Sequence, residues 1–284
     1  MFDQRPYRSV LYIPASKERA LEKARGLPVD AIIFDLEDAV SADEKEAARA
    51  TLSQALAEDG YGARVKIIRI NGLDTEWGMD DARAASEMKP DAILLPKVSG
   101  PGDLDALATI TGETPLWAMM ETPQGMLSAA EIAAHPRLAG MVMGTNDLAK
   151  ELQTRFRPDR LPLVTGLGLC LLAAKAHGLI VVDGVYNAFK DEDGLREECN
   201  QGRDMGFDGK TLIHPAQVEI TNAAYAPSDA EIDLARRQIT AFEEVEAQGQ
   251  GVAVVDGKIV ENLHVATARE ILAKAEAISA LQAG

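Results

Sequence analysis

Cysteine is scarce in this sequence, which contains only Cys170 and Cys199 in 284 residues. Two cysteines cannot build the disulfide framework of a small secreted protein, and neither has a histidine at the spacing of a metal-binding motif. We expect both to be buried or incidental thiols. The N-terminal residues MFDQRPYRSV contain no apolar segment after their basic residues, so no secretory signal is expected. These absences favour a cytoplasmic protein.

The sequence also lacks long apolar runs and an excess of positive charge. No uninterrupted apolar run approaches the roughly 18 to 20 residues of a membrane-spanning helix. The formal net charge of −16 argues against binding to nucleic acid or to an anionic membrane. Positive charge nevertheless collects between residues 1 and 25, where Asp3, Glu18 and Glu22 are outnumbered by Arg5, Arg8, Lys17, Arg19, Lys23 and Arg25. A local basic patch on an acidic chain suits a small polyanion.

What the sequence does contain is a repeated alternation of apolar runs and helix-forming runs. The apolar runs of strand length lie at residues 9–14, 30–37, 64–71, 91–98, 116–121, 139–144, 179–187 and 209–214. Their apolar residues are continuous rather than alternating, as in parallel strands that are buried on both faces. This pattern predicts an α/β fold, a closed (β/α)8 TIM barrel. An open doubly wound sheet is the alternative, but no strand is followed by a GxGxxG turn.

The chain continues beyond the eighth unit. A polar amphipathic helix is expected at 228–248, a hairpin at 252–260 that turns at Asp256 and Gly257, and a closing helix at 266–281. We therefore predict a catalytic barrel domain, 1–226, and a C-terminal helix–hairpin–helix extension, 227–284. The extension could act as a lid on its own barrel mouth or on that of a neighbouring subunit, and both alternatives stay open.

Two carboxylates follow neighbouring strands, Glu121 at the end of the fifth and Asp147 just after the sixth. Parallel strands of a barrel end at the same mouth, so the two side chains should lie beside each other. Two carboxylates, with the remaining positions left to water and substrate, suit Mg²⁺ better than a softer metal. The alternative is a helix cap and a solvated charge at the edge of the sheet.

Further polar residues stand at the ends of other strands, namely Asp35, Glu37, Asp38, Arg69, Asn71, Lys97, Asp183 and His214. Each alone is more often a solvated loop charge, but their convergence on one mouth indicates a site. Arg69 would offer a fork to a carboxylate or an enolate oxygen, and Glu37 and Asp38 would hold metal-bound waters. The chemistry indicated is stabilisation of a negatively charged oxygen next to a carbonyl.

Several motifs in register carry a resemblance to a known family. They are RSVLYIPAS (8–16), FDLEDAV (34–40), IRIN (68–71), LLPKV (94–98), MET followed by Gly125, and KTLIHPAQV (210–218). The chain resembles the citrate lyase β-subunit-like (HpcH/HpaI aldolase/citrate lyase) family of CoA-ester enzymes over essentially its whole length. Within that family, GMVMGTNDLAKEL (140–152) and VAVVDGKIVENLHV (252–265) are most similar to the malyl-CoA thioesterase branch, the shorter paralogues of malyl-CoA lyase.

The resemblance implies a Mg²⁺-dependent barrel, with Mn²⁺ as a substitute, in which Glu121 and Asp147 are metal ligands. It implies that Arg69 contacts the substrate carbonyl and carboxylate, and that CoA lies across the mouth of a trimeric or hexameric assembly. The residues that we expect to contact substrate or CoA are Arg8, Tyr12, Lys17, Arg19, Asn71, Lys97, Gly144, Thr145, Asn146 and His214.

Two departures from the family pattern bear on the reaction. Glu261 stands where the lyases usually carry an aspartate that acts as acid or base, and GTND (144–147) replaces the GxED or GxAD of the lyases. The first hypothesis is hydrolysis of (3S)-malyl-CoA, with Glu261 activating water. The alternatives are reversible carbon–carbon cleavage of malyl-CoA, β-methylmalyl-CoA or citramalyl-CoA, and a citrate lyase β-type subunit of a larger complex.

Overall fold

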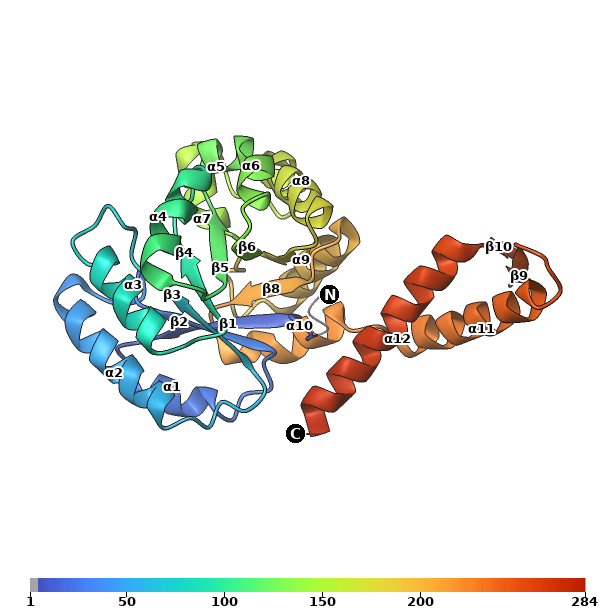
Figure 1. Cartoon of the computed structure of the whole chain (residues 1–284), viewed down its shortest axis with the longest axis horizontal. Helices are drawn as coiled ribbons and strands as arrows, with labels where there is room; N and C mark the ends of the chain where they lie inside the picture. The colour runs from blue at the N-terminus through green and yellow to red at the C-terminus, as the bar shows by residue number, and fades with distance from the viewer. Residues whose placement is uncertain (1–4, 284) are drawn as a thin grey trace. The chain divides into compact units, whose positions relative to one another are not determined.

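The computed structural model describes residues 5–283 and contains a closed barrel of parallel strands in the order β1 to β8 (Figure 1). The strands are β1 (Ser9–Pro14), β2 (Ala31–Asp35), β3 (Val65–Arg69), β4 (Ala92–Leu95), β5 (Leu116–Met120), β6 (Leu138–Met143), β7 (Ile180–Asp183) and β8 (Gly209–Leu212). β1 pairs with both β2 and β8, which closes the sheet. The predicted barrel is confirmed, and the open sheet is excluded.

Helices follow the strands around the barrel. They are α1 (Glu18–Ala24), η1 (Ala42–Glu44), α2 (Lys45–Ala57), α3 (Gly78–Glu87), α4 (Pro101–Thr111), α5 (Pro123–Leu127), α6 (Ala129–Ala133), α7 (Thr145–Glu151), α8 (Leu161–Ala176), α9 (Glu192–Met205), η2 (Pro215–Gln217) and α10 (Val218–Tyr225). Two short helices, α5 and α6, follow β5, and they are divided at Ser128, which leaves the helical region with ψ near 9°. No helix within residues 5–283 is both long and apolar enough to cross a membrane.

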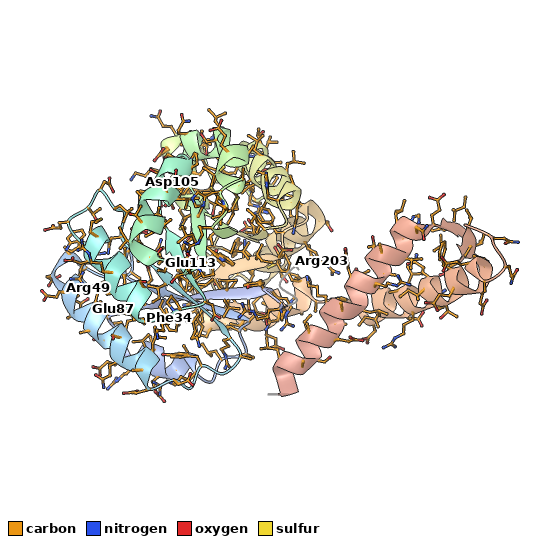
Figure 2. All side chains as sticks on the ribbon, in the orientation of Figure 1. Phe34, Arg49, Glu87, Asp105, Glu113 and Arg203 are labelled. Carbon is orange, nitrogen blue, oxygen red and sulfur yellow. The ribbon has the colours of Figure 1, made fainter. Side chains whose placement is uncertain are left out.

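The strands bury side chains in two separate layers. Alternate strand residues such as Val10, Ile33 and Ile67 form a cluster made almost entirely of strand residues, which fills the inside of the barrel. The intervening residues face outward and pack against the helices. Phe34, which is labelled in Figure 2, is one of these. Its ring and that of Tyr61 form a T-shaped pair with a centroid distance of 5.0 Å. This alternation decides which strand-end residues point into the mouth.

The chain divides into two compact units, Tyr7–Tyr225 and a second that contains the described residues from Ala226 onward. The second unit consists of α11 (Asp229–Glu246), β9 (Ala253–Val255), β10 (Lys258–Val260) and α12 (Asn262–Ala283). Phe242 and three valines form its small core, and Asp256 and Gly257 both adopt positive φ at the predicted hairpin turn. The expected helix, hairpin and helix are all present.

Candidate active site

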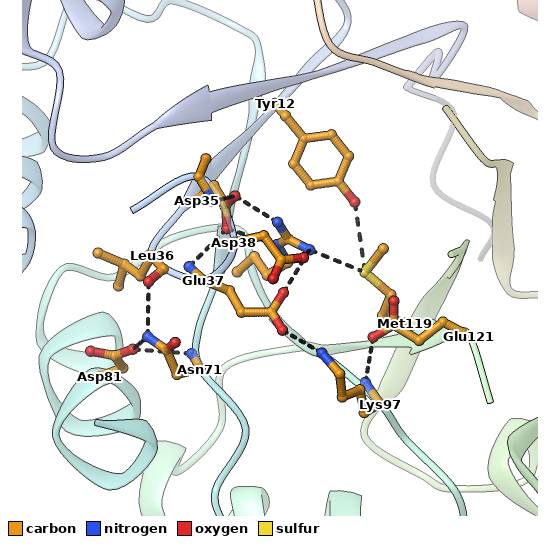
Figure 3. A network of polar contacts seen from close by, with 12 residues as sticks. Tyr12, Asp35, Leu36, Glu37, Asp38, Asn71, Asp81, Lys97, Met119 and Glu121 are labelled. Carbon is orange, nitrogen blue, oxygen red and sulfur yellow. Dashed lines mark hydrogen bonds and ion pairs between the residues drawn. The ribbon is translucent and has the colours of Figure 1, made fainter. Parts of the chain in front are cut away.

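Arg69 occupies the centre of the barrel mouth at the end of β3. Val65 and Ile67 face inward, so Arg69 does too, and the same alternation brings Asp35 inward at the end of β2. Nε and Nη2 of Arg69 donate to the two carboxylate oxygens of Asp35 at 2.7 and 2.6 Å (Figure 3). This bidentate pair fixes the plane of the guanidinium.

Tyr12, at the inward-facing position near the end of β1, lies against the same guanidinium. The carbon at the centre of the Arg69 fork is 4.9 Å from the centroid of the Tyr12 ring. Burial raises the pKa of the Tyr12 hydroxyl, which therefore stays protonated, and it donates to the sulfur of Met119 at 3.7 Å. Burial alone would lower the pKa of Arg69, but the charge of Asp35 holds it above its ordinary value.

Glu37 lies between two cations beside this pair (Figure 3). One carboxylate oxygen, Oε1, accepts from Nζ of Lys97 at 2.7 Å. The other, Oε2, is buried and forms an ion pair with Nη1 of Arg69 at 2.7 Å. Asp38 is more remote, 3.5 Å from Arg69, with a side chain that is 65% exposed.

Glu121 follows β5 and is almost completely buried. Its Oε1 accepts from the backbone N–H of Lys97 at 2.8 Å. A Cβ at Gly144 would lie 2.4 Å from Oε2 of Glu121, so only glycine permits these two segments of the chain to approach so closely. Burial and the negative charge of Glu37 raise the pKa of Glu121 to about 7, with a smaller contribution from Asp147.

A cavity of about 290 Å³ opens beside Arg69, and neither Glu37 nor Glu121 lines it directly. Arg69 lines it, and so does Asp147, which lies in the first turn of α7. Its remaining polar lining comes from Tyr12, Asp35, Asp38, Gly144, Thr145 and Asn146, and its apolar lining from Ala39, Met119, Met143, Val185 and Ile213. The cavity therefore combines a fixed cation, carboxylates and an apolar wall.

The donor set fits a hard divalent cation. No group of three or more histidine, cysteine, aspartate or glutamate side chains within residues 5–283 could hold a metal by itself. Glu121 and Asp147 nevertheless interact, and two carboxylates are enough for Mg²⁺, which keeps several waters. Burial and the negative charge of Glu37 raise the pKa of Glu121, and a bound cation would stabilise the ionised form of this carboxylate.

Two residues assigned to the mouth from sequence lie elsewhere. Arg8 precedes β1, at the end of the strand opposite the mouth, where it is buried in a bidentate pair with Asp30 at 2.9 and 2.7 Å. The prediction that Arg8 contacts substrate or CoA is therefore wrong. Asp183 faces outward from β7 and pairs with Arg160 and Lys210 at 2.7 and 3.3 Å, so it cannot serve as a base in the cavity.

Other predicted contact residues lie at or near the mouth with different surroundings. Asn71 is buried, and its side chain is engaged by Lys45 and Asp81. The side-chain amides of Asn146 and Asn187 hydrogen-bond each other. The His214 ring stacks on Phe189 with a centroid distance of 4.5 Å, and its Nδ1 accepts from the backbone of η2.

The basic residues of the first βα unit are exposed. Nζ of Lys17 lies 3.0 Å from the carboxylate of Glu44, and Arg19 points from the exposed face of α1. In the C-terminal compact unit, Glu261 is also exposed. It lies directly before α12, and its backbone N–H donates to Nδ1 of His264 at 3.0 Å. The structure of each unit therefore leaves these three side chains accessible.

Sequence reasoning did not find the role of Asp35 or of Lys45. Asp35 was recognised as a strand-end residue, but its bidentate grip on Arg69 depends on the register of β2 against β3. Lys45 begins a helix and touches the site through two backbone carbonyls and the side-chain oxygen of Asn71. No spacing rule connects a helical lysine to the backbone carbonyl of a residue eight positions earlier.

Comparison with known proteins agrees with this geometry. Residues 8–215 match the HpcH/HpaI aldolase/citrate lyase family, and residues 164–279 match the C-C bond lyases of the TIM-barrel fold. The chain is 72% identical to a (3S)-malyl-CoA thioesterase of Cereibacter sphaeroides (strain ATCC 17029 / ATH 2.4.9) over 98% of both chains. It is 34% identical to the citrate lyase subunit beta of Escherichia coli (strain K12), over 96% of this chain and 94% of that one.

A solved structure shares the fold and contains relevant ligands. The protein CitE from Mycobacterium tuberculosis, in complex with magnesium, acetoacetate and coenzyme A, superimposes with a TM-score of 0.81 at 28% identity, covering 96% of this chain and all of that one. The resemblance inferred from the motifs is thereby confirmed. The chain is an enzyme of the HpcH/HpaI aldolase/citrate lyase family.

Proposed function

We propose that this enzyme hydrolyses (3S)-malyl-CoA to malate and CoA, and that Glu121 and Asp147 hold the Mg²⁺ on which the reaction depends. The observation that carries the proposal is that Arg69 and Asp147 line the same cavity. It is supported by the 72% identity to a (3S)-malyl-CoA thioesterase over nearly the full length of both chains.

The residues of the mouth have distinct tasks in this proposal. Arg69, fixed by Asp35, binds the negatively charged oxygens of the acyl group. A bound Mg²⁺ would polarise the thioester carbonyl as a Lewis acid. The carboxylates of Glu37 and, at the exposed edge, Asp38 would orient water at the metal site. The apolar wall of the cavity limits the access of other water molecules.

The water that attacks the thioester needs a base, and we assign this role to Glu261. Its carboxylate is exposed on the C-terminal segment 227–284, which we propose acts as a lid. The carboxylate would accept a proton from the water as the water oxygen bonds to the thioester carbon, and collapse of the resulting oxyanion would break the C–S bond and release the thiolate of CoA. We further propose that Lys17 and Arg19 contact the phosphates of CoA, and that the enzyme assembles as a trimer or hexamer.

The second candidate is carbon–carbon cleavage of malyl-CoA or of its methylated relatives. It is favoured by the 34% identity to a citrate lyase subunit beta, which also keeps a β-type subunit role open. In a lyase, Arg69 and the metal site would stabilise an enolate rather than the oxyanion of hydrolysis. The same mouth serves either reaction, so the products must decide.

One assay separates the candidates. Purified enzyme is incubated with (3S)-malyl-CoA and Mg²⁺, while free thiol and glyoxylate are followed separately. Hydrolysis releases thiol without glyoxylate, whereas cleavage releases glyoxylate with acetyl-CoA and no free thiol. Chelation should abolish the thiol release and added Mg²⁺ should restore it, with Mn²⁺ tested as a substitute. If neither product forms, the proposed substrate is wrong.

A further inference from the structure

Lys45 is a buried lysine that lies behind the mouth. It begins α2, is 6% exposed, and does not line the cavity. Its ammonium donates to the backbone oxygens of Leu36 and Glu37 at 2.9 and 2.7 Å and to Oδ1 of Asn71 at 2.8 Å. An ammonium has three protons, so all are used, and none goes to a carboxylate.

These contacts converge on the segment that follows β2. The Leu36 carbonyl accepts from both Lys45 and Nδ2 of Asn71, the latter at 2.8 Å. The segment has just left the sheet, so its carbonyl groups need partners other than a neighbouring strand. A buried ammonium is costly to desolvate, and burial lowers the pKa of Lys45, opposed by the charges of Asp35 and Asp81.

The support extends outward through a chain of side chains. Nδ2 and the backbone N–H of Asn71 donate to Oδ2 of Asp81 at 2.6 and 3.0 Å (Figure 3). Oδ1 of Asp81 accepts from Arg49 at 2.9 Å. Asn71 is therefore oriented by α3, and Arg49 ties α3 to α2, the helix that carries Lys45.

On the cavity side, Glu37 is held by different groups. Its backbone N–H donates to Oδ1 of Asp35 at 2.9 Å, while its backbone oxygen accepts from Lys45. Its carboxylate then reaches Arg69 and Lys97. The main chain of Glu37 is thus fixed from both sides, and only the side chain faces the mouth.

We infer that Lys45 is a positioning residue, which holds the main chain of Leu36 and Glu37 from behind so that the Glu37 carboxylate meets Arg69 and Lys97. Asn71 belongs to the same support rather than to the substrate contacts. The inference rests on the proposed function for the task of Glu37, but the geometry that it describes does not depend on the reaction.

A double-mutant cycle tests the inference. Lys45→Met removes every donor and keeps most of the side-chain volume, and we expect kcat to fall about 10- to 100-fold with little change in KM, as for groups that orient a metal site. In a Glu37→Gln background, the same change should cost no more than about twofold, because residues that act through one another are not additive. Equal losses in both backgrounds would overturn the inference.

Lys210→Met is the matched control. Lys210 is a second buried lysine, but its ammonium pairs with Asp183 and Glu198, which do not line the mouth. Its replacement should lower stability and leave kcat of the folded enzyme unchanged. If Lys45→Met does not fold, Lys45→Gln, which keeps one or two donors, enters the same cycle.

The crystal structure of the Lys45 variant separates this inference from the proposed function. If the wild type does not hydrolyse malyl-CoA, the proposed function fails, and the position of Glu37 then decides the inference by itself. A Glu37 carboxylate that has left Arg69 and Lys97 supports a positioning role. If the Glu37 carboxylate keeps its contacts with Arg69 and Lys97 in the Lys45 variant, the inference is contradicted, whatever the activity of the variant.

Discussion

The backbone N–H of Lys97 donates to Oε1 of Glu121 at 2.8 Å, and Lys97 makes this contact in the left-handed region, with φ of 55°. A residue other than glycine is disfavoured in this conformation, so the surrounding contacts must hold Lys97 there. The ammonium of the same residue reaches Glu37 at 2.7 Å. Lys97 therefore contacts both Glu121, which we assign to the metal, and Glu37, which we assign to the water at the metal site.

The first prediction compares two replacements of Lys97. Glycine accepts a positive φ and valine does not, so Lys97→Val should lower the free energy of unfolding by about 1–2 kcal/mol relative to Lys97→Gly. Urea denaturation measures the difference. Lys66, within β3, is the control, because valine should be the more stable replacement in a strand. The same order at both positions would contradict the argument.

The second prediction concerns the metal ligands. Glu121→Gln and Asp147→Asn should each abolish Mg²⁺-dependent activity and weaken Mg²⁺ binding measured by calorimetry. Both variants should fold, because Glu121 already resists ionisation with its pKa near 7 and Asp147 is only half-buried. Glu151→Gln, at the exposed end of the same helix α7, serves as the control. Full Mg²⁺ binding by either ligand variant would disprove the assignment.

The third prediction concerns the CoA phosphates. Replacing Lys17 and Arg19 by alanine should raise KM for the CoA ester several-fold and leave kcat nearly unchanged, since such contacts are equal in ground and transition states. The Lys17–Glu44 pair is exposed, so its loss should hardly change stability. Lys23→Ala provides a control at the other end of α1. An unchanged KM would mean that CoA lies elsewhere.

The fourth prediction tests Glu261. Glu261→Gln should lower kcat by on the order of 100-fold or more with little change in KM, because general base catalysis typically contributes about 10²–10⁴-fold. Glu261→Asp should raise glyoxylate release relative to hydrolysis. Glu270→Gln, exposed on the helix that follows, is the control. Wild-type rates and products in both Glu261 variants would place the base on another group.

The fifth prediction concerns acid stability. Burial alone would raise the pKa of Asp183, but Lys210 and Arg160 lower it below its ordinary value of 3.8. The carboxylate therefore stabilises the folded state above that pH and loses this effect as the pH falls through its lowered pKa. Asp183→Asn should cost about 3–5 kcal/mol near neutral pH, because it leaves buried cations without their partner.

Unfolding at neutral and acid pH checks this prediction. The difference between wild type and Asp183→Asn should begin to shrink as the pH falls below the ordinary aspartate value, and it should be smallest below the lowered pKa of Asp183, where both side chains are neutral. Asp208→Asn is a useful comparison, because the Asp208 pair with Lys175 is partly exposed and should contribute little. A difference that does not depend on pH would show that Asp183 acts through packing alone.

Local sequence patterns were sufficient for the fold. Each strand of the barrel was predicted within a few residues, because apolar runs of strand length alternate with helical periodicity along the chain. The Asp256-Gly257 turn was predicted for the same kind of reason, since a positive φ favours those residues. The family, and the strand ends at which the site should lie, also followed from motifs in the chain.

The direction in which each strand-end side chain points was decided only by the tertiary structure. Strands that are buried on both faces are apolar at every position, so their sequence does not show which residues face inward. Asp35 and Asp183 both end such strands, yet closure of the barrel turns Asp35 toward Arg69 and Asp183 toward Arg160. The buried support of Lys45 likewise exists only once α2 and α3 are packed against the barrel, because its partners are carbonyl and amide groups from two separate segments, the one after β2 and the one after β3.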